Sequence, residues 1–143
     1  MGFPDRIERT LELAHPPDTV WAALTTAEGL AAWFGDAAAI ELRPGGSAWL
    51  SWTAGKRVDL LVERVDEPTT FAFSWQIYGL PDGDPRRTHV EFTLEPIASG
   101  TRLRVVESGF AQLPDGAYHE LYDDHAQGWT RELGELVDYL DAG

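Results

Sequence analysis

Two short apolar segments follow one another near the start of the chain, within HPPDTVWAALTTAEGLAAWFG at residues 15–35. The two prolines suit the first turn of a helix, where a missing backbone N–H costs nothing, and Asp18 is favourable at that helix end. Thr25 with Glu28 predicts a capping box for a second helix, and Gly35 predicts its end. Few folds place two short helices between one strand and a long run of strands. The fold that best fits this chain is built around a hollow interior.

The segments on both sides of this helix pair have the periodicity of strands. Residues 6–14 alternate between apolar and polar side chains, and so do most segments between residues 37 and 109. The clearest is FAFSWQI at 71–77, whose aromatic residues share one face with Ile77. Short turn sequences such as PGG at 44–46 separate the segments. We therefore expect seven strands, six of them in a continuous antiparallel meander.

The periodicity changes near the C-terminus. Apolar side chains recur at three- and four-residue steps from Tyr118 to Leu140, which predicts an amphipathic helix of roughly six turns. Its apolar stripe needs an apolar partner, and the concave face of the sheet is the adequate one. The predicted fold class is α+β, with a seven-stranded curved antiparallel sheet wrapped around a long C-terminal helix. We expect residues 1–143 to form a single domain of this kind.

This arrangement predicts a pocket, because one helix about 10–12 Å across cannot fill a wide, curled sheet. Large side chains must fill the remaining space or line a cavity, and the chain has six Trp, six Phe and four Tyr. Each tryptophan alone could be a core residue, but the set as a whole favours a lined cavity. We expect its mouth beside the short helices and the loop at 79–86. Eight residues are candidates for ligand binding: Trp33, Trp52, Phe73, Trp75, Phe92, Tyr122, His125 and Trp129.

Composition argues against several classes of function. The chain has 24 acidic and 11 basic residues, a net charge of −13, which repels nucleic acids and anionic lipid surfaces. It has no cysteine, and the two histidines at 119 and 125 do not have zincin spacing, so we expect no metal. No cofactor motif is present either. We expect no signal peptide, and no apolar run is long enough to insert into a membrane, so we expect a cytoplasmic protein.

Two titratable residues have positions that could face the interior. His125 lies on the apolar stripe one turn before Trp129, either as a structural histidine or as a polar group or general acid–base inside the cavity. Glu107 has the inward phase of Leu103 and Val105 if its strand has no bulge. It could then act as an acid or base, whereas at a strand end it would reach solvent or a loop amide. These two residues are the candidates for catalysis.

The pieces described so far occur in the order found in a known family. The segments that carry the resemblance are IERT at 7–10, VWAAL at 20–24, WFG at 33–35, PGG at 44–46, VERVDEP at 62–68, FSW at 73–75, GTRL at 100–103, ESGF at 107–110 and GW at 128–129. This order resembles the helix-grip fold of the birch-pollen allergen, the START domains and the SRPBCC superfamily. The chain is most similar to the branch named after the activator of the heat-shock-protein-90 ATPase. The resemblance covers essentially the whole chain and implies the fold, but it does not select one activity.

Three functions are consistent with these observations. The leading one is binding of a small hydrophobic or aromatic molecule between the C-terminal helix and the sheet. The second is a cyclase- or hydrolase-like enzyme that uses His125 and Glu107. The third is a protein-interaction module, as a homodimer or a chaperone partner. In the activator after which this branch is named, a separate N-terminal domain makes the main chaperone contact. We expect no such domain in this chain of 143 residues, so a chaperone partner is less favoured.

Overall fold

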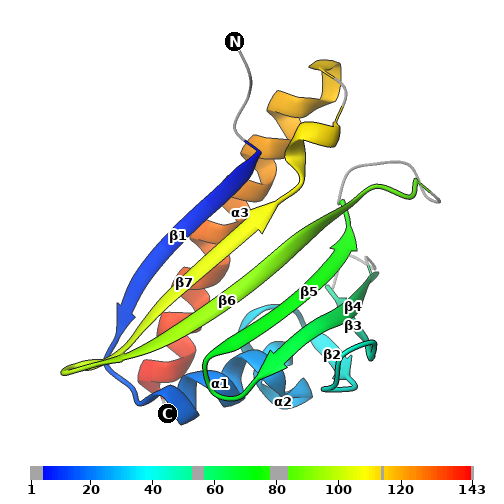
Figure 1. The fold of residues 1–143 in the computed structure, drawn as a ribbon. Helices are drawn as coiled ribbons and strands as arrows, with labels where there is room; N and C mark the ends of the chain where they lie inside the picture. Colours follow the sequence, from blue (N-terminus) through cyan, green and yellow to red (C-terminus); the bar gives the residue numbers. More distant parts are fainter. Residues whose placement is uncertain (1–4, 53–56, 78–83, 114, 143) are drawn as a thin grey trace.

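The computed structural model describes residues 5–52, 57–77, 84–113 and 115–142 (Figure 1). Strand β1 (Arg6–Leu13) is followed by helices α1 (Pro17–Thr25) and α2 (Ala27–Trp33). Six strands follow: β2 (Ala37–Ile40), β3 (Ser47–Ser51), β4 (Arg57–Asp66), β5 (Thr70–Gln76), β6 (Arg87–Ile97) and β7 (Gly100–Ser108). The chain continues through a short 3-10 turn, η1 (Phe110–Gln112), into the long helix α3 (Asp115–Ala142). The predicted fold class is confirmed.

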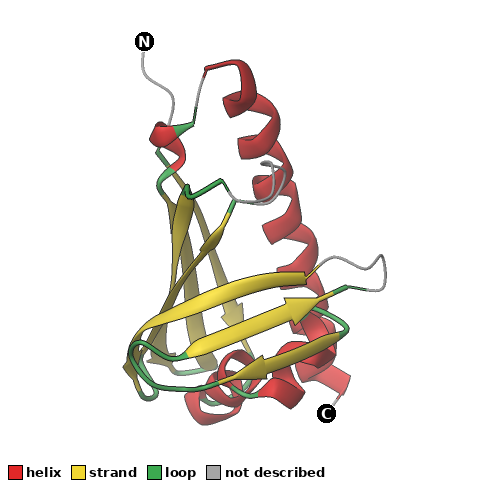
Figure 2. Cartoon of the chain, turned by 90° about the vertical axis from the view of Figure 1, so that its right-hand side faces the viewer, coloured by secondary structure: helices red, strands yellow, loops and turns green. Residues whose placement is uncertain are grey.

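All seven strands form one antiparallel sheet in the order β1-β7-β6-β5-β4-β3-β2. Strands β2 to β7 are a continuous meander, and β1 pairs with β7 at the opposite edge, as expected. Figure 2 shows that the sheet is strongly bent and that α3 runs along it, with α1 and α2 at the end where α3 finishes. None of the helices in the described part of the chain has the length and hydropathy that a membrane span requires.

The core lies between the inner face of the sheet and α3. Strands β5, β6 and β7 contribute alternating side chains that are almost completely buried: Phe71, Phe73, Val90, Phe92, Leu103 and Val105. Helix α3 contributes Trp129, Leu133 and Leu136 at the predicted three- and four-residue steps. Each of these large side chains stabilises the fold by about 1.5–3 kcal/mol through its burial. Much of the interior is therefore filled by the protein's own side chains.

Strand β4 contains an irregularity that explains its mixed sequence pattern. Its register with β5 shifts between Val62 and Arg64. Before the shift the buried residues are Leu60 and Val62, and after it Val65 is the partly buried one. A β-bulge adds one residue to a strand and so reverses which positions face inward. A single alternating phase could not describe this segment.

The predicted capping box is wrong by one residue. The N-cap of α2 is Thr26, whose hydroxyl oxygen accepts a hydrogen bond from the backbone N–H of Gly29 at 2.9 Å. Thr25 belongs to α1, where its hydroxyl donates to a backbone carbonyl of the same helix. Gly29 also allows α1 and α2 to approach closely, because a Cβ there would lie 2.7 Å from the carbonyl oxygen of Ala22.

Candidate functional site

A cavity of about 370 Å³ lies between α3 and the part of the sheet formed by β3, β4 and β5. Its apolar wall comes from the end of α2, the end of β3, and strands β4 and β5: Phe34, Trp52, Val58 and Trp75. The opposite wall is α3, which contributes His125, Trp129 and Glu132. Exposed residues on α3, including Asp124 and Gln127, form its rim, so the cavity reaches solvent. Its volume lies within the range of about 300–1,000 Å³ that is typical of small-molecule sites.

The eight predicted ligand-binding residues have different positions relative to this cavity. Four of them line it: Trp52, Trp75, His125 and Trp129. Trp33 lines an adjoining groove, and its indole N–H donates to the carbonyl of Ala23 at 2.7 Å. Among the described residues, the cavity wall does not include Phe73, Phe92 or Tyr122. As ligand contacts, all eight stay predictions.

The three residues outside the cavity wall have other contacts. Phe73 and Phe92 are deep core residues with 1% and 0% of their surface exposed. The Tyr122 hydroxyl donates to the carbonyl of Arg6 at 3.0 Å, next to the ring of Phe110. Alternation along a strand identifies the inward face, but it does not say how deep each side chain lies. Residues 79–83 of the loop expected at the mouth fall outside the described residues.

Sequence reasoning missed two important residues of the cavity wall. Phe34 stacks on Trp33 and lies with its ring centroid 5.5 Å from that of Trp129. Glu132 follows Trp129 by three residues and His125 by seven, which places it on the same stripe of α3. This spacing was the signal that could have identified it, but a charged residue on an apolar stripe is easily assigned to the polar face.

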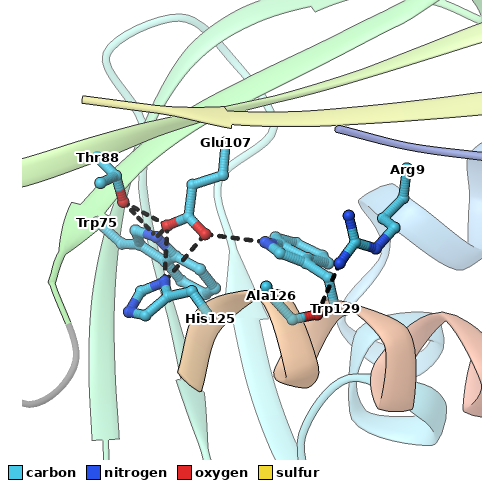
Figure 3. A network of polar contacts seen from close by, with 7 residues as sticks. All are labelled: Arg9, Trp75, Thr88, Glu107, His125, Ala126 and Trp129. Carbon is cyan, nitrogen blue, oxygen red and sulfur yellow. Dashed lines mark hydrogen bonds and ion pairs between the residues drawn. The ribbon is translucent and has the colours of Figure 1, made fainter. Parts of the chain in front are cut away.

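Glu107 is the centre of a polar network beside the cavity (Figure 3). Its side chain is completely buried, and four side chains from β5, β6 and α3 bond to its carboxylate. The indole N–H groups of Trp75 and Trp129 each donate at 2.9 Å, to different oxygens. The Thr88 hydroxyl donates to Oε2, and Nδ1 of His125 lies 2.9 Å from Oε1. The predicted inward phase of Glu107 is confirmed, and the alternative in which it reaches solvent is wrong.

The environment of Glu107 favours its ionised form. Burial raises the pKa of this carboxyl, but the hydrogen bonds from His125, Thr88 and Trp75 outweigh burial, and the pKa lies below its ordinary value. Glu107 does not line the cavity, at least not the part formed by described residues, so it has no contact with a molecule bound there. It acts instead on its neighbours, because it orients the His125 ring and fixes two tryptophan side chains of the cavity wall.

The described residues contain no cluster of three or more histidine and acidic side chains that could hold a metal ion. The features of the site are its aromatic rings, one histidine oriented by a carboxylate, and one buried acidic residue on α3.

A family model, described as "Activator of Hsp90 ATPase homolog 1-like protein", matches residues 14–141. The chain belongs to this family. The match agrees with the resemblance inferred from the sequence segments. Members of the family share the fold described above, so family membership explains the sheet, the helix pair and α3, while the chemistry of the cavity depends on the residues of each chain.

Solved structures agree with this assignment. Protein MLL2253 from Mesorhizobium loti is 28% identical, with a TM-score of 0.83 over 96% of this chain and 97% of that chain. DynU16, a protein in the dynemicin biosynthetic locus, is 26% identical, with a TM-score of 0.79 over 96% of this chain and 48% of that chain. The Aha1 dimer from Colwellia psychrerythraea is 22% identical, with a TM-score of 0.72 over 94% and 95% of the two chains, and shows the fold alone. Comparison with curated proteins finds no match.

Proposed function

We propose that this chain binds a small, largely apolar or aromatic molecule in the cavity between α3 and the sheet. The observation that carries the proposal is the aromatic wall of a cavity that reaches solvent. Trp52 is only partly buried and lies with its ring centroid 6.2 Å from that of Phe34. A planar ligand would cover these rings and gain both apolar burial and ring contacts.

Buried hydrogen bonds fix two of the tryptophans in the cavity wall, which supports a binding role. Trp75 and Trp129 donate to the same carboxylate, that of Glu107, so neither indole can turn without breaking a buried hydrogen bond. Arg9 on β1 donates to the carbonyl of Ala126 at 3.2 Å, and this contact holds α3 against the sheet (Figure 3). A ligand that enters a preorganised site loses less free energy in ordering its walls.

One relative supports a small organic molecule as the ligand. DynU16 comes from a biosynthetic locus, and its fold matches nearly all of this chain. An interaction module has less support, because Leu42, Leu61 and Tyr139 are the only large apolar side chains exposed in the described part of the chain. A homodimer and a cytoplasmic location stay predictions.

Titration with aromatic probes tests the proposal. Naphthalene and anthraquinone derivatives should quench tryptophan fluorescence in a saturable manner. The variant Trp52→Ala should weaken binding by about tenfold, because it removes one face of the wall. Trp49→Ala is the matched control, since this tryptophan packs under the guanidinium of Arg57 and does not line the cavity. The proposal fails if no probe saturates, or if both variants weaken binding equally.

The pair of His125 and Glu107 supports a second function, acid–base catalysis on the bound molecule. His125 lines the cavity, and Glu107 holds its Nδ1 at 2.9 Å, as in sites where a carboxylate orients a catalytic imidazole. Glu107 would be a positioning residue only. With 1-naphthyl acetate as a probe substrate, His125→Ala should abolish hydrolysis and leave 1-naphthol binding largely intact. Absence of hydrolysis by the natural chain would remove support for a hydrolase.

A further inference from the structure

A groove of about 630 Å³ adjoins the aromatic cavity. Four residues line both hollows: Phe34, Trp52, Arg131 and Glu132. The charged side chains of the groove are mainly acidic, and within the described residues they are Asp36, Glu132, Glu135 and Asp138 against Arg131. A positively charged group would be attracted to this groove, and a carboxylate would be repelled.

Glu132 lies where the two hollows meet, and its carboxylate is poorly compensated. The residue is 8% exposed, and within the described residues its Oε2 has no hydrogen-bond partner. Among the described residues its ion-pair partner is Arg131, whose Nε lies 3.6 Å from Oε1 on a side chain that is 68% exposed. A buried carboxylate oxygen without a donor is unfavourable. A donor supplied by a ligand would remove this penalty.

The surroundings of Glu132 compensate its negative charge only in part. Burial, together with the nearby carboxyl of Glu135, raises the pKa of Glu132 to about 8, although Arg131 acts in the opposite direction. At pH 7 this carboxyl is therefore mainly protonated in the free chain, and a cation placed beside it would favour the ionised form, with its proton released to solvent. The aromatic rings of Phe34 and Trp52 line the same junction, and aromatic faces also attract cations.

We propose that the ligand carries a protonated amine, which pairs with Glu132 at the junction while the apolar body lies against Phe34 and Trp52. This inference rests on the proposed binding function and adds the chemical class of the ligand. The ligand then supplies a donor to Oε2 of Glu132, which has none among the described residues, and the acidic groove attracts the cation from solvent. The site is expected to reject carboxylate ligands of the same shape.

Three naphthalene probes of similar size test the proposal by calorimetric titration at pH 7. They are 1-naphthylmethylamine, which is a cation, 1-naphthalenemethanol, which is neutral, and 1-naphthoate, which is an anion. The amine should bind about tenfold or more tightly than the alcohol, and the anion should bind most weakly. Glu132→Gln should abolish the preference for the amine and leave the affinity for the alcohol within about twofold. Glu120→Gln, an exposed change on the same helix outside both hollows, should keep the preference.

The outcomes separate this inference from the proposed function. If the alcohol binds as tightly as the amine, the inference is overturned and the binding function stands. If 1-naphthoate binds most tightly, Arg131 is the recognition group and the inference is overturned. If none of the probes binds, both proposals fail. Because the three probes are compared first on the unaltered chain, the result does not depend on whether Glu132→Gln folds normally. A preference for the amine that persists in a folded Glu132→Gln protein would also overturn the assignment.

Discussion

The hydrogen bonds at Glu107 allow a quantitative prediction for the variant Glu107→Ala. Trp75 would keep a partner, because its indole N–H also lies 3.0 Å from the Thr88 hydroxyl. Trp129 and His125 would each lose the hydrogen bond that this carboxylate provides. A buried donor without a partner costs about 1–3 kcal/mol, and the truncated side chain adds a cavity. We expect a loss of about 5 kcal/mol in the free energy of unfolding, comparable with the total stability of some small domains.

The conservative variant Glu107→Gln should be much less destabilised. If the new NH₂ group takes the place of Oε2, it can donate to the Thr88 hydroxyl, while the remaining oxygen still accepts from Trp129 and His125. The Trp75 N–H loses Oε2 as an acceptor and keeps the Thr88 hydroxyl. The variant loses charge-assisted hydrogen bonds but no longer buries a charge, so we expect a loss of about 2 kcal/mol. Glu95→Gln, an exposed change on β6, is the control and should stay within about 0.5 kcal/mol of the natural chain.

Urea unfolding, followed by tryptophan fluorescence and circular dichroism, measures these differences. The pKa of Glu107 is lower in the folded chain than its ordinary value of about 4.3, so its ionised form stabilises the fold above that pH. This stabilisation is lost as the pH falls through the folded pKa. The difference in the free energy of unfolding between the natural chain and Glu107→Gln should therefore become smaller as the pH falls from 6 to 3. A gap that does not change with pH, or an alanine variant as stable as the glutamine variant, would refute the reasoning.

Two further predictions concern Glu132 and Gly29. The pKa of Glu132 is raised to about 8 in the folded chain, so its ionisation opposes folding as the pH rises above the unfolded value. Glu132→Gln should match the natural chain near pH 5 and be more stable by about 2 kcal/mol at pH 9, as measured by urea unfolding at both pH values; equal stability at both would contradict the assignment. Gly29→Ala should destabilise by about 2 kcal/mol, because its Cβ would lie 2.7 Å from backbone oxygen and force α1 and α2 apart. A Cβ at Gly134 would have open space around it, so Gly134→Ala should stabilise α3 by up to about 1 kcal/mol. Thermal unfolding measures both variants. If both shift the Tm in the same direction, the close approach of α1 and α2 does not explain the effect of Gly29→Ala.

Local patterns predicted the elements of the fold but not their irregularities. The alternation around Phe71 and Phe92 correctly identified strands and inward faces, since side-chain direction in a strand depends only on the backbone. The bulge in β4 was not predicted, and the N-cap of α2 was predicted one residue too early, because neither a bulge nor a one-residue shift of a cap clearly changes the local composition. Phe73 and Trp75 share a face, yet only Trp75 lines the cavity. Depth below the surface is set by how the sheet bends around α3.

The candidate site depended more strongly on tertiary structure. Sequence periodicity indicated that Glu107 and His125 could face inward, since each position follows the phase of its own element. These two residues come into contact only because of the register of β5, β6 and β7 and the placement of α3 over the sheet. The same packing brings the two indole N–H groups to the Glu107 carboxylate. Distances between side chains on different elements are properties of packing, and no local pattern contains them. The sequence alone therefore determined the fold and an interior with large aromatic residues, and the tertiary structure decided which rings line a cavity and that Glu132 lies at its junction with an acidic groove.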